Sequence, residues 1–382
     1  MKNILFPVVL VAALCGANAT CGYAAESVKT LSVTDFGAKG DGKKDNTKAI
    51  NKAIAKAPRG TVVEIPAGRF VTGTIRLKSD ITLQIDEGAE VIGSGNLDNY
   101  ECYSPLRDMS KYDTGAGTRN ANITSDKRWT KALILGERLK NVAIKGKGLI
   151  NGMHVSDSLG EESMRGPHAI LLAECDSVRL EGFEIKCASN YAVLGYEMRN
   201  STISGLTIEE GWDGVHIRGC ENVVIEKCDI KTGDDAIAGG YWKNMTIMDC
   251  SINSSCNGIR MIEPSEDLEI ANCKIYGAGV YPHRTSGAAK RTSTIYGIVL
   301  EPGAWGDAPG HTENVYIHDV IIDNLLSPIV YSMGENNTCS GLTIENVTAT
   351  HISFNTTPLN RQDCVRMWDN ITIKNMVVRK GE

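Results

Sequence analysis

The amino-acid sequence predicts an all-β protein, a single-stranded right-handed parallel β-helix with three short strands in each coil of about 22 residues and a capping helix near its N-terminus. Three observations support this prediction. The sequence contains an internal repeat of 22 to 23 residues, short stretches of each repeat alternate apolar and polar side chains, and an amphipathic segment precedes the repeats.

The internal repeat is clearest between residues 201 and 277. One column of isoleucines recurs at steps of 22, 22 and 23 residues, and two further columns keep the same steps. The three columns are Ile203, Ile225, Ile247 and Ile270; Leu206, Cys228, Cys250 and Cys273; and Ile208, Ile230, Ile252 and Ile275. A pair of helices needs a longer repeat, whereas three short strands separated by turns fit this one, and stacked coils bury the apolar columns. The consensus of leucine-rich repeats is missing and propeller blades are about twice as long, so the β-helix is favoured.

The amphipathic segment DNTKAINKAIAKA, which begins at Asp45, predicts the capping helix. Asp45 or Asn46 stands where an N-cap is expected. The residues that share the apolar face are Ala49, Ile50, Ala53, Ile54 and Ala57. A helix at this point is expected to cover the open end of the stack, whose strand edges would otherwise be exposed.

Two segments interrupt the repeat, from Cys102 to Lys131 and from Pro282 to Thr294. Both are rich in small and polar residues and are predicted to be long loops over one face of the stack. Long loops in a compact solenoid usually carry function.

Residues 1–24 are predicted to be a cleaved signal peptide, which leaves residues 25–382 as one β-helix catalytic domain. Lys2 is followed by the apolar run ILFPVVLVAALC and then by small residues that end near Ala24. An uncleaved membrane anchor is the alternative. We therefore expect a secreted or periplasmic protein with no membrane span in its mature chain.

The charge and the cysteine content of the chain indicate which partners and cofactors it can bind. The net charge of −6 without a basic cluster argues against a nucleic-acid partner. Two of the twelve cysteines fall in the predicted signal peptide, and the ten that remain show neither CxxC pairs nor zinc spacing. We expect no metal or other cofactor and a monomeric chain. The cysteine column is expected to hold buried free thiols, although neighbouring rungs are close enough for a disulfide.

The repeat also brings carboxylates together. Seven residues after successive members of the second column stand Asp213, Asp235 and Asn257, which are therefore expected at one position of three neighbouring coils. Asp234 precedes Asp235 in a GDD turn. Carboxylates at this range share protons, so one stays protonated while another is ionised, as glycosidic cleavage requires. A calcium site or a plain polar turn would also explain the cluster.

The chain resembles glycoside hydrolase family 28, the polygalacturonase-like β-helix enzymes. DFGAKGDGKKDNTKAINKAI resembles the N-terminal coil of that family, GWDGVHI its NTDG motif and TGDDAIA its GDD motif one coil later, and YGIVLEPGAW its later coils. The resemblance extends from about Val33 to near the C-terminus. It implies that Asp234 is the general acid, that Asp213 and Asp235 hold and activate the attacking water, and that an α-linked plant-type polysaccharide or oligosaccharide is cleaved with inversion.

Two departures from the family pattern bear on the substrate. Asn257 replaces the histidine of the GHG motif, and Glu301 replaces the lysine of the RIK motif, whose cations hold a uronate carboxylate. A modified, branched or neutral sugar is therefore expected rather than plain polygalacturonan. The side chains predicted to bind it are Asn257, Arg260, His216, His283 and Arg284. Two rival functions remain at this stage, a calcium-dependent β-helix polysaccharide lyase with an arginine base and a non-catalytic carbohydrate-binding β-helix.

Overall fold

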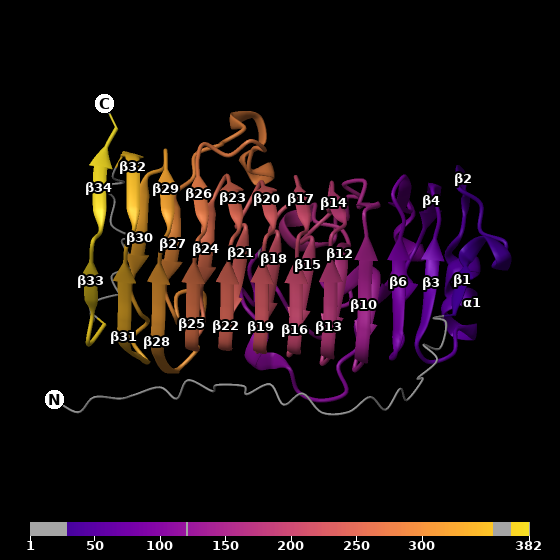
Figure 1. The fold of residues 1–382 in the computed structure, drawn as a ribbon, viewed down its shortest axis with the longest axis horizontal. Helices are drawn as coiled ribbons and strands as arrows, with labels where there is room; N and C mark the ends of the chain where they lie inside the picture. The colour runs from indigo at the N-terminus through magenta and orange to yellow at the C-terminus, as the bar shows by residue number, and fades with distance from the viewer. Residues whose placement is uncertain (1–28, 120, 354–367, 382) are drawn as a thin grey trace, which may run out of the picture.

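The computed structural model describes residues 29–119, 121–353 and 368–381, and it confirms the parallel β-helix (Figure 1). The coils stack along one axis, and three long sheets run the length of the stack. The predicted signal peptide, residues 1–24, lies outside the described residues. Within those residues, no helix has the length and apolar character needed to cross a membrane.

Sheet A follows the first predicted column, because Leu180, Ile203, Ile225, Ile247 and Ile270 pair one after another in register. Its strands in spatial order are β1 (Thr30–Ser32), β3 (Thr61–Ile65), β6 (Ile81–Ile85), β10 (Lys140–Gly146), β13 (Asp176–Glu181), β16 (Arg199–Ser204), β19 (Glu221–Glu226), β22 (Lys243–Met248), β25 (Glu266–Ala271), β28 (Gly310–His318), β31 (Asn337–Glu345) and β33 (Thr372–Lys374).

Sheet B follows the third predicted column, in which Ile208, Ile230, Ile252 and Ile275 pair in register. Its strands in spatial order are β2 (Asp41–Asp45), β4 (Gly68–Thr72), β7 (Ala89–Gly93), β11 (Leu149–Asn151), β14 (Glu184–Lys186), β17 (Thr207–Glu209), β20 (Asp229–Thr232), β23 (Ser251–Ser254), β26 (Lys274–Tyr276), β29 (Ile321–Asp323), β32 (Thr348–Ile352) and β34 (Val377–Lys380).

Sheet C carries the candidate site, and loops cover its outer face. Its parallel strands in spatial order are β5 (Ile75–Arg76), β9 (Lys131–Glu137), β12 (His168–Ala173), β15 (Val193–Tyr196), β18 (Val215–Arg218), β21 (Ile237–Gly240), β24 (Asn257–Met261), β27 (Tyr296–Leu300) and β30 (Ser327–Tyr331). A short strand, β8 (Glu101–Cys102), pairs with β9 in the antiparallel direction. The outward-pointing side chains of β18 and β21 are buried, which shows that the loops predicted over one face lie here.

The capping helix is α1 (Thr47–Lys56), at the β1 end of the stack (Figure 1). Ile50, Ala53 and Ile54 are buried, as predicted. Asp45 caps the first turn, because its Oδ1 accepts the Thr47 backbone N–H at 2.8 Å. Asn46, the other predicted cap, occupies the N-cap position, and its carbonyl accepts the Ile50 N–H at 2.9 Å. Its buried side chain makes no capping bond and is hydrogen-bonded to backbone carbonyls around it.

Among the described residues, five short 3-10 helices connect the strands, and two of them contribute the buried side chains Val33 and Tyr112. They are η1 (Val33–Phe36), η2 (Leu97–Asn99), η3 (Ser110–Tyr112), η4 (Glu161–Ser163) and η5 (Arg284–Ala289). Three of them, η3, η4 and η5, belong to the loops that cover sheet C.

The cysteine column packs as free thiols. Cys228, Cys250 and Cys273 are buried, and every cysteine among the described residues is free. The disulfide between neighbouring rungs that the sequence allowed is therefore absent from this column. The sulfur atoms of the column fill the interior as small apolar groups.

Replacing Ile230 with alanine is expected to lower the free energy of unfolding by about 2–5 kcal/mol, since the side chain is fully buried between coils that contact only their neighbours. Ile321 lies in the same sheet but is 54% exposed, so Ile321→Ala is the matched control. Urea-unfolding midpoints of the two variants measure the difference. Equal midpoints would contradict the claim that the buried isoleucine column stabilises the stack.

Candidate active site

A cavity of about 240 Å³ lies over the middle of sheet C. Its floor comes from the turns that lead into β18, β21 and β24, and its walls come from the loops before β9, β12 and β27. The predicted catalytic residues Asp213, Asp234 and Asp235 all line it, and so do three of the predicted binding residues, His216, Arg260 and His283. The structure thus brings six of the eight predicted site residues to one cavity.

The coil register places two aspartates as the repeat predicts. The Gly214 N–H bonds the Asp235 carbonyl at 3.0 Å and the Ala236 N–H bonds the Asn257 carbonyl at 3.0 Å, so residues 213, 235 and 257 occupy one position of successive coils. The next outward position holds His216, Ala238 and Arg260, paired in register. Asp234 also lines the cavity because its turn interrupts the strand alternation.

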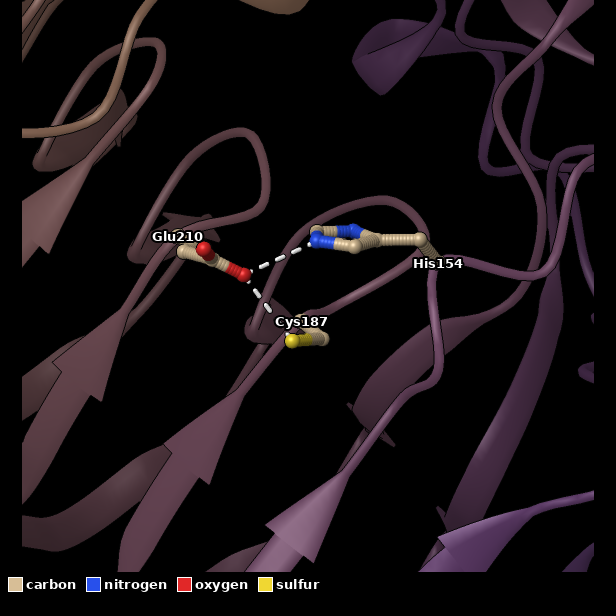
Figure 2. A group of neighbouring side chains, drawn as sticks. All are labelled: His154, Cys187 and Glu210. Atoms are coloured by element: carbon tan, nitrogen blue, oxygen red, sulfur yellow. Dashed lines mark hydrogen bonds and ion pairs between the residues drawn. The ribbon is translucent and has the colours of Figure 1, made fainter.

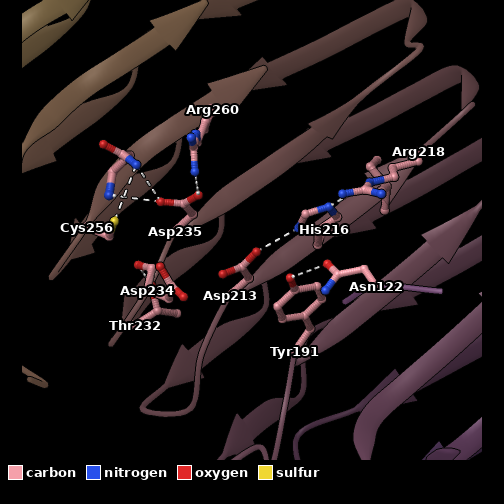
Figure 3. Close-up of polar contacts among 12 residues, drawn as sticks. Asn122, Tyr191, Asp213, His216, Arg218, Thr232, Asp234, Asp235, Cys256 and Arg260 are labelled. Atoms are coloured by element: carbon pink, nitrogen blue, oxygen red, sulfur yellow. Dashed lines mark hydrogen bonds and ion pairs between the residues drawn. The ribbon is translucent and has the colours of Figure 1, made fainter. Parts of the chain in front are cut away.

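Figure 3 shows Asp213, Asp234 and Asp235 close together. Asp234 also contacts two side chains from the covering loops, Arg165 and His283. Its Oδ2 lies 3.2 Å from Nη2 of Arg165, and its Oδ1 lies 3.5 Å from Nε2 of His283. Burial by itself would raise the pKa of Asp234, but the hydrogen bond from His283 and the charge of Arg165 outweigh it and hold the pKa well below its usual range. Asp234 is therefore ionised.

Asp213 ends a hydrogen-bonded chain that runs into the protein. Its Oδ2 lies 2.7 Å from Nδ1 of His216, and Nε2 of His216 lies 3.0 Å from Nε of Arg218. Arginine only donates, so Nε2 accepts and Nδ1 carries the proton that His216 donates to Asp213. Burial and the charges of Asp234 and Asp235 raise the pKa of Asp213 well above its usual value. Burial and Arg218 lower the pKa of His216, which keeps the ring neutral and lets it orient Asp213.

Asp235 is held by the next coil. Its Oδ1 accepts the backbone N–H of Asn257 at 3.1 Å and the side-chain amide of Asn257 at 2.7 Å. Nη1 of Arg260 lies 3.3 Å from Oδ2. Burial raises the pKa of Asp235, the charge of Arg260 opposes this, and Asp234 adds to it. Asn257 does not line the cavity, so the residue at the family's histidine position orients Asp235 rather than facing the cavity.

Glu301 is the partner of Arg260. Nε and Nη2 of Arg260 lie 2.8 and 2.5 Å from Oε1 of Glu301, which is 1% exposed. The ring of Trp305 lies 5.1 Å from the guanidinium. The acidic residue at the family's lysine position thus neutralises the arginine one coil earlier, which weakens Arg260 as a grip for a free uronate carboxylate.

Arg165 and Glu161 are functional candidates that the sequence reasoning missed. Arg165 is buried; its guanidinium reaches Glu161 at 3.4 Å and Glu162 at 3.1 Å, besides Asp234, and lies 3.7 Å from the centroid of the Trp212 ring. Oε2 of Glu161 is buried and accepts no hydrogen bond. Their loop, 152–167, has no repeat. The sequence signal for them is the charged run EESMR between two glycines, where a coil should have only a short turn.

The predicted binding residue Arg284 faces away from the cavity. Its Nη1 lies 2.7 Å from Nδ1 of His154, and its guanidinium lies 5.6 Å from the Trp212 ring. Although its neighbour His283 lines the cavity, Arg284 does not. Arg284 and Arg165 therefore lie against the same tryptophan, and only Arg165 reaches the aspartates.

Glu161 gives the site a measurable pH signature. Burial raises the pKa of Glu161 from 4.5 to about 7, although Arg165 lowers it. Between these values the unfolded chain releases the proton and the folded chain keeps it, so stability falls as pH rises through this window. Glu161→Gln removes this dependence. The difference in free energy of unfolding between the variant and the wild type is therefore expected to be about 3 kcal/mol more favourable to the variant at pH 8 than at pH 4. Urea unfolding at both values tests this, and parallel pH profiles would contradict the raised pKa.

One group of side chains in the cavity has donor atoms close enough to share a metal ion, namely Asp234, Asp235 and Cys256, whose atoms lie within 4.8 Å of one another. Calcium takes six to eight oxygen ligands, whereas this group offers a thiol and two carboxylates already paired with Arg165, His283 and Arg260. The donor set does not fit calcium.

Comparison with known proteins gives a consistent picture. Residues 30–281 match the family model described as rhamnogalacturonase A/epimerase, pectate lyase-like. The chain is 27% identical over 249 residues to an exo-poly-alpha-D-galacturonosidase of Dickeya chrysanthemi, an alignment that covers 55% of the chain and 41% of the relative. It is 29% identical over 299 residues to a mannuronan C5-epimerase of Azotobacter vinelandii, covering 76% and 26%. The chain thus spans less than half the length of either relative.

Among solved structures, the chain is similar to the polygalacturonase of Erwinia carotovora ssp. carotovora. The TM-score is 0.63 at 18% sequence identity, and the superposition covers 92% of this chain and 93% of that one. At this identity the likeness shows the shared right-handed β-helix.

Proposed function

The chain belongs to the rhamnogalacturonase A/epimerase, pectate lyase-like family, and on that premise we propose that it is an exported glycoside hydrolase of pectin-like polysaccharides or oligosaccharides. The observation that carries the proposal is the cavity in which Asp213, Asp234 and Asp235 meet in unequal surroundings. Carboxyl groups with separated proton affinities are what acid–base cleavage of a glycosidic bond requires.

In the proposed mechanism Asp234 protonates the leaving oxygen, while Asp213 and Asp235 orient and deprotonate the attacking water. His283 and Arg165 keep the pKa of Asp234 low. Both of these side chains line the cavity, so a bound sugar that hydrogen-bonds to them withdraws them from Asp234. The proton shared by the three aspartates then moves to Asp234, next to the glycosidic oxygen.

The proposed substrate is the end of a chain or a short oligosaccharide. The cavity is smaller than the roughly 300–1,000 Å³ of a typical ligand pocket, and contacts between loops close its walls. Nδ2 of Asn122 donates to Glu161 at 2.9 Å, and Oγ1 of Thr285 donates to Glu162 at 2.7 Å. These contacts join the covering loops on one side of the cavity, which supports a substrate whose terminal units alone enter.

The sugar at the cleavage point is proposed to be modified, branched or neutral. The three arginines of the cavity, Arg165, Arg218 and Arg260, each pair with buried carboxylates. An added free carboxylate would have to compete with those partners in a site already rich in acidic groups. A hydroxyl-rich neutral unit or an esterified uronate meets no such competition.

The same cavity supports a polysaccharide lyase less well than a hydrolase. A lyase needs a base and a cation for the uronate, but the pKa of Arg260 is raised by Glu301 and Asp235 despite burial, and the acidic group does not fit calcium. Hydrolysis needs no arginine base and no cation, because aspartates supply its acid and its base. Because one relative is named an epimerase, the assay must also follow the configuration at C5.

The test is a screen of pectic oligosaccharides and their methyl esters for release of reducing ends. The proposal expects new reducing ends, no absorbance from a double bond, and activity that survives a chelator. Unsaturated products would show a lyase, an unchanged chain length with altered C5 configuration would show an epimerase, and binding without any change would show a non-catalytic β-helix. Any of these results would overturn the proposal.

A further inference from the structure

A second cluster of chemically active side chains, His154, Cys187 and Glu210, lies outside the cavity (Figure 2). The three residues follow β11, β14 and β17, so they come from turns of three successive coils of sheet B. Nε2 of His154 and Sγ of Cys187 both lie 2.9 Å from Oε2 of Glu210. All three side chains are half-buried, which leaves one side of the cluster open to solvent.

We propose that this cluster binds a divalent transition-metal ion, with Zn²⁺ the best fit. Imidazole nitrogen, thiolate and carboxylate are the ligands that zinc takes at about 2.0–2.3 Å. Such bonds separate the ligand atoms of a tetrahedral site by roughly 3.3–3.8 Å. The atoms here lie within 4.8 Å of one another, so side-chain rotation is enough to admit the ion. The thiol excludes calcium and magnesium, which prefer oxygen, and water completes the open position.

Binding of the metal ion displaces the proton that lies between Cys187 and Glu210. Cys187 donates its thiol proton to Glu210. The ion bonds the thiolate, so the thiol proton leaves for solvent as the metal–sulfur bond forms. Glu210 stays ionised and exchanges two hydrogen bonds for one metal bond.

Arg284 is the competitor of the ion. Its guanidinium donates to Nδ1 of His154 at 2.7 Å, so Nδ1 accepts and the proton of His154 is on Nε2, where it points to Glu210. A zinc ligand at Nε2 needs the opposite tautomer, with Nδ1–H donated to an acceptor. Metal binding therefore requires that Arg284 leave His154. Arg284→Gln removes a positive charge beside the ion and supplies an amide oxygen for Nδ1–H, so it is expected to strengthen binding.

The experiment titrates the full chain with Zn²⁺ in a calorimeter and with Co²⁺ in a spectrophotometer, where a thiolate–cobalt charge-transfer band reports the sulfur ligand. We expect one ion per chain, at least tenfold weaker binding in Cys187→Ser and in His154→Gln, and about tenfold tighter binding in Arg284→Gln. Cys102→Ser is the matched control, because Cys102 is also half-buried but belongs to β8, away from the cluster, and it should bind as wild type does.

Circular dichroism confirms that each variant is folded. Absence of stoichiometric binding in both the wild type and the folded Arg284→Gln variant would overturn the proposal, as would a cobalt spectrum without the thiolate band or an affinity that Cys187→Ser leaves unchanged. None of these readouts depends on hydrolysis, so a negative result for the metal site would leave the proposed activity untouched, and the reverse also holds.

Discussion

Asp234→Asn is expected to lower kcat/KM for hydrolysis of a natural glycoside by about 10²–10⁴-fold, the contribution of a positioned general acid. Asparagine keeps the shape of the side chain but has no acidic proton to give to the leaving oxygen. Asp229→Asn is the matched control, since Asp229 lies in the same coil on the outer face of sheet B and pairs with Lys231. The control should retain wild-type activity, and equal losses in both variants would contradict the assignment.

A substrate with a good leaving group separates the roles of the aspartates. An aryl glycoside whose phenol is already acidic needs little protonation, so Asp234→Asn should lose far less activity on it than on the natural linkage. Asp213→Asn should be impaired on both, because water activation is needed in either case. Burial raises the pKa of Asp213, so Asp213 could carry the acidic proton instead. If Asp213→Asn, and not Asp234→Asn, regains activity on the aryl glycoside, Asp213 is the acid.

Arg165→Gln is expected to lower the free energy of unfolding by about 3–5 kcal/mol, because it leaves buried carboxylates without their cation. Glu161 and Glu162, with side chains 4% and 9% exposed, and Asp234 all lose this partner. Arg179→Gln is the matched control, since Arg179 makes one exposed ion pair with its side chain 66% exposed. Thermal midpoints of both variants measure the difference, and similar midpoints would contradict the role of Arg165 in holding the loop.

The same variant changes the pH profile in a defined direction. Arg165 lowers the pKa of Asp234 and of the proton-sharing set to which it belongs. Its removal raises those proton affinities, so the basic limb of kcat/KM against pH should move to higher pH. A purely structural arginine would lower stability without moving this limb.

The repeat made most of the fold predictable. The isoleucine columns set the register of sheets A and B, and the step from one coil to the next then placed Asp213 and Asp235 at one position. Because coil stacking is a local rule repeated along the chain, the spacing of a few apolar residues was enough to locate these carboxylates.

The rest of the site depends on loops that carry no repeat. Arg165 and Glu161 reach the cavity only because loop 152–167 folds over sheet C, and their positions follow from tertiary contacts such as Asn122 with Glu161. His216 illustrates a different limit. Its rung position was predicted, but whether the ring faces a substrate or Asp213 depends on Arg218, two residues along the same strand.

The departures from the family pattern are coupled in space. Glu301 stands where the family has lysine, and it pairs with Arg260 one coil earlier. Asn257 stands where the family has histidine, and it donates to Asp235. Both changes leave the three aspartates in place while they replace the uronate-binding charges beside them, which is why a different sugar, rather than a lost reaction, is proposed.

The most direct test of the central claim is the proton NMR spectrum of the first product that wild type releases from an α-linked pectic oligosaccharide. If Asp234 acts as acid while Asp213 and Asp235 deliver water, the new reducing end appears first as the β anomer and only later mutarotates. Initial appearance of the α anomer, or of an unsaturated product, would contradict the account.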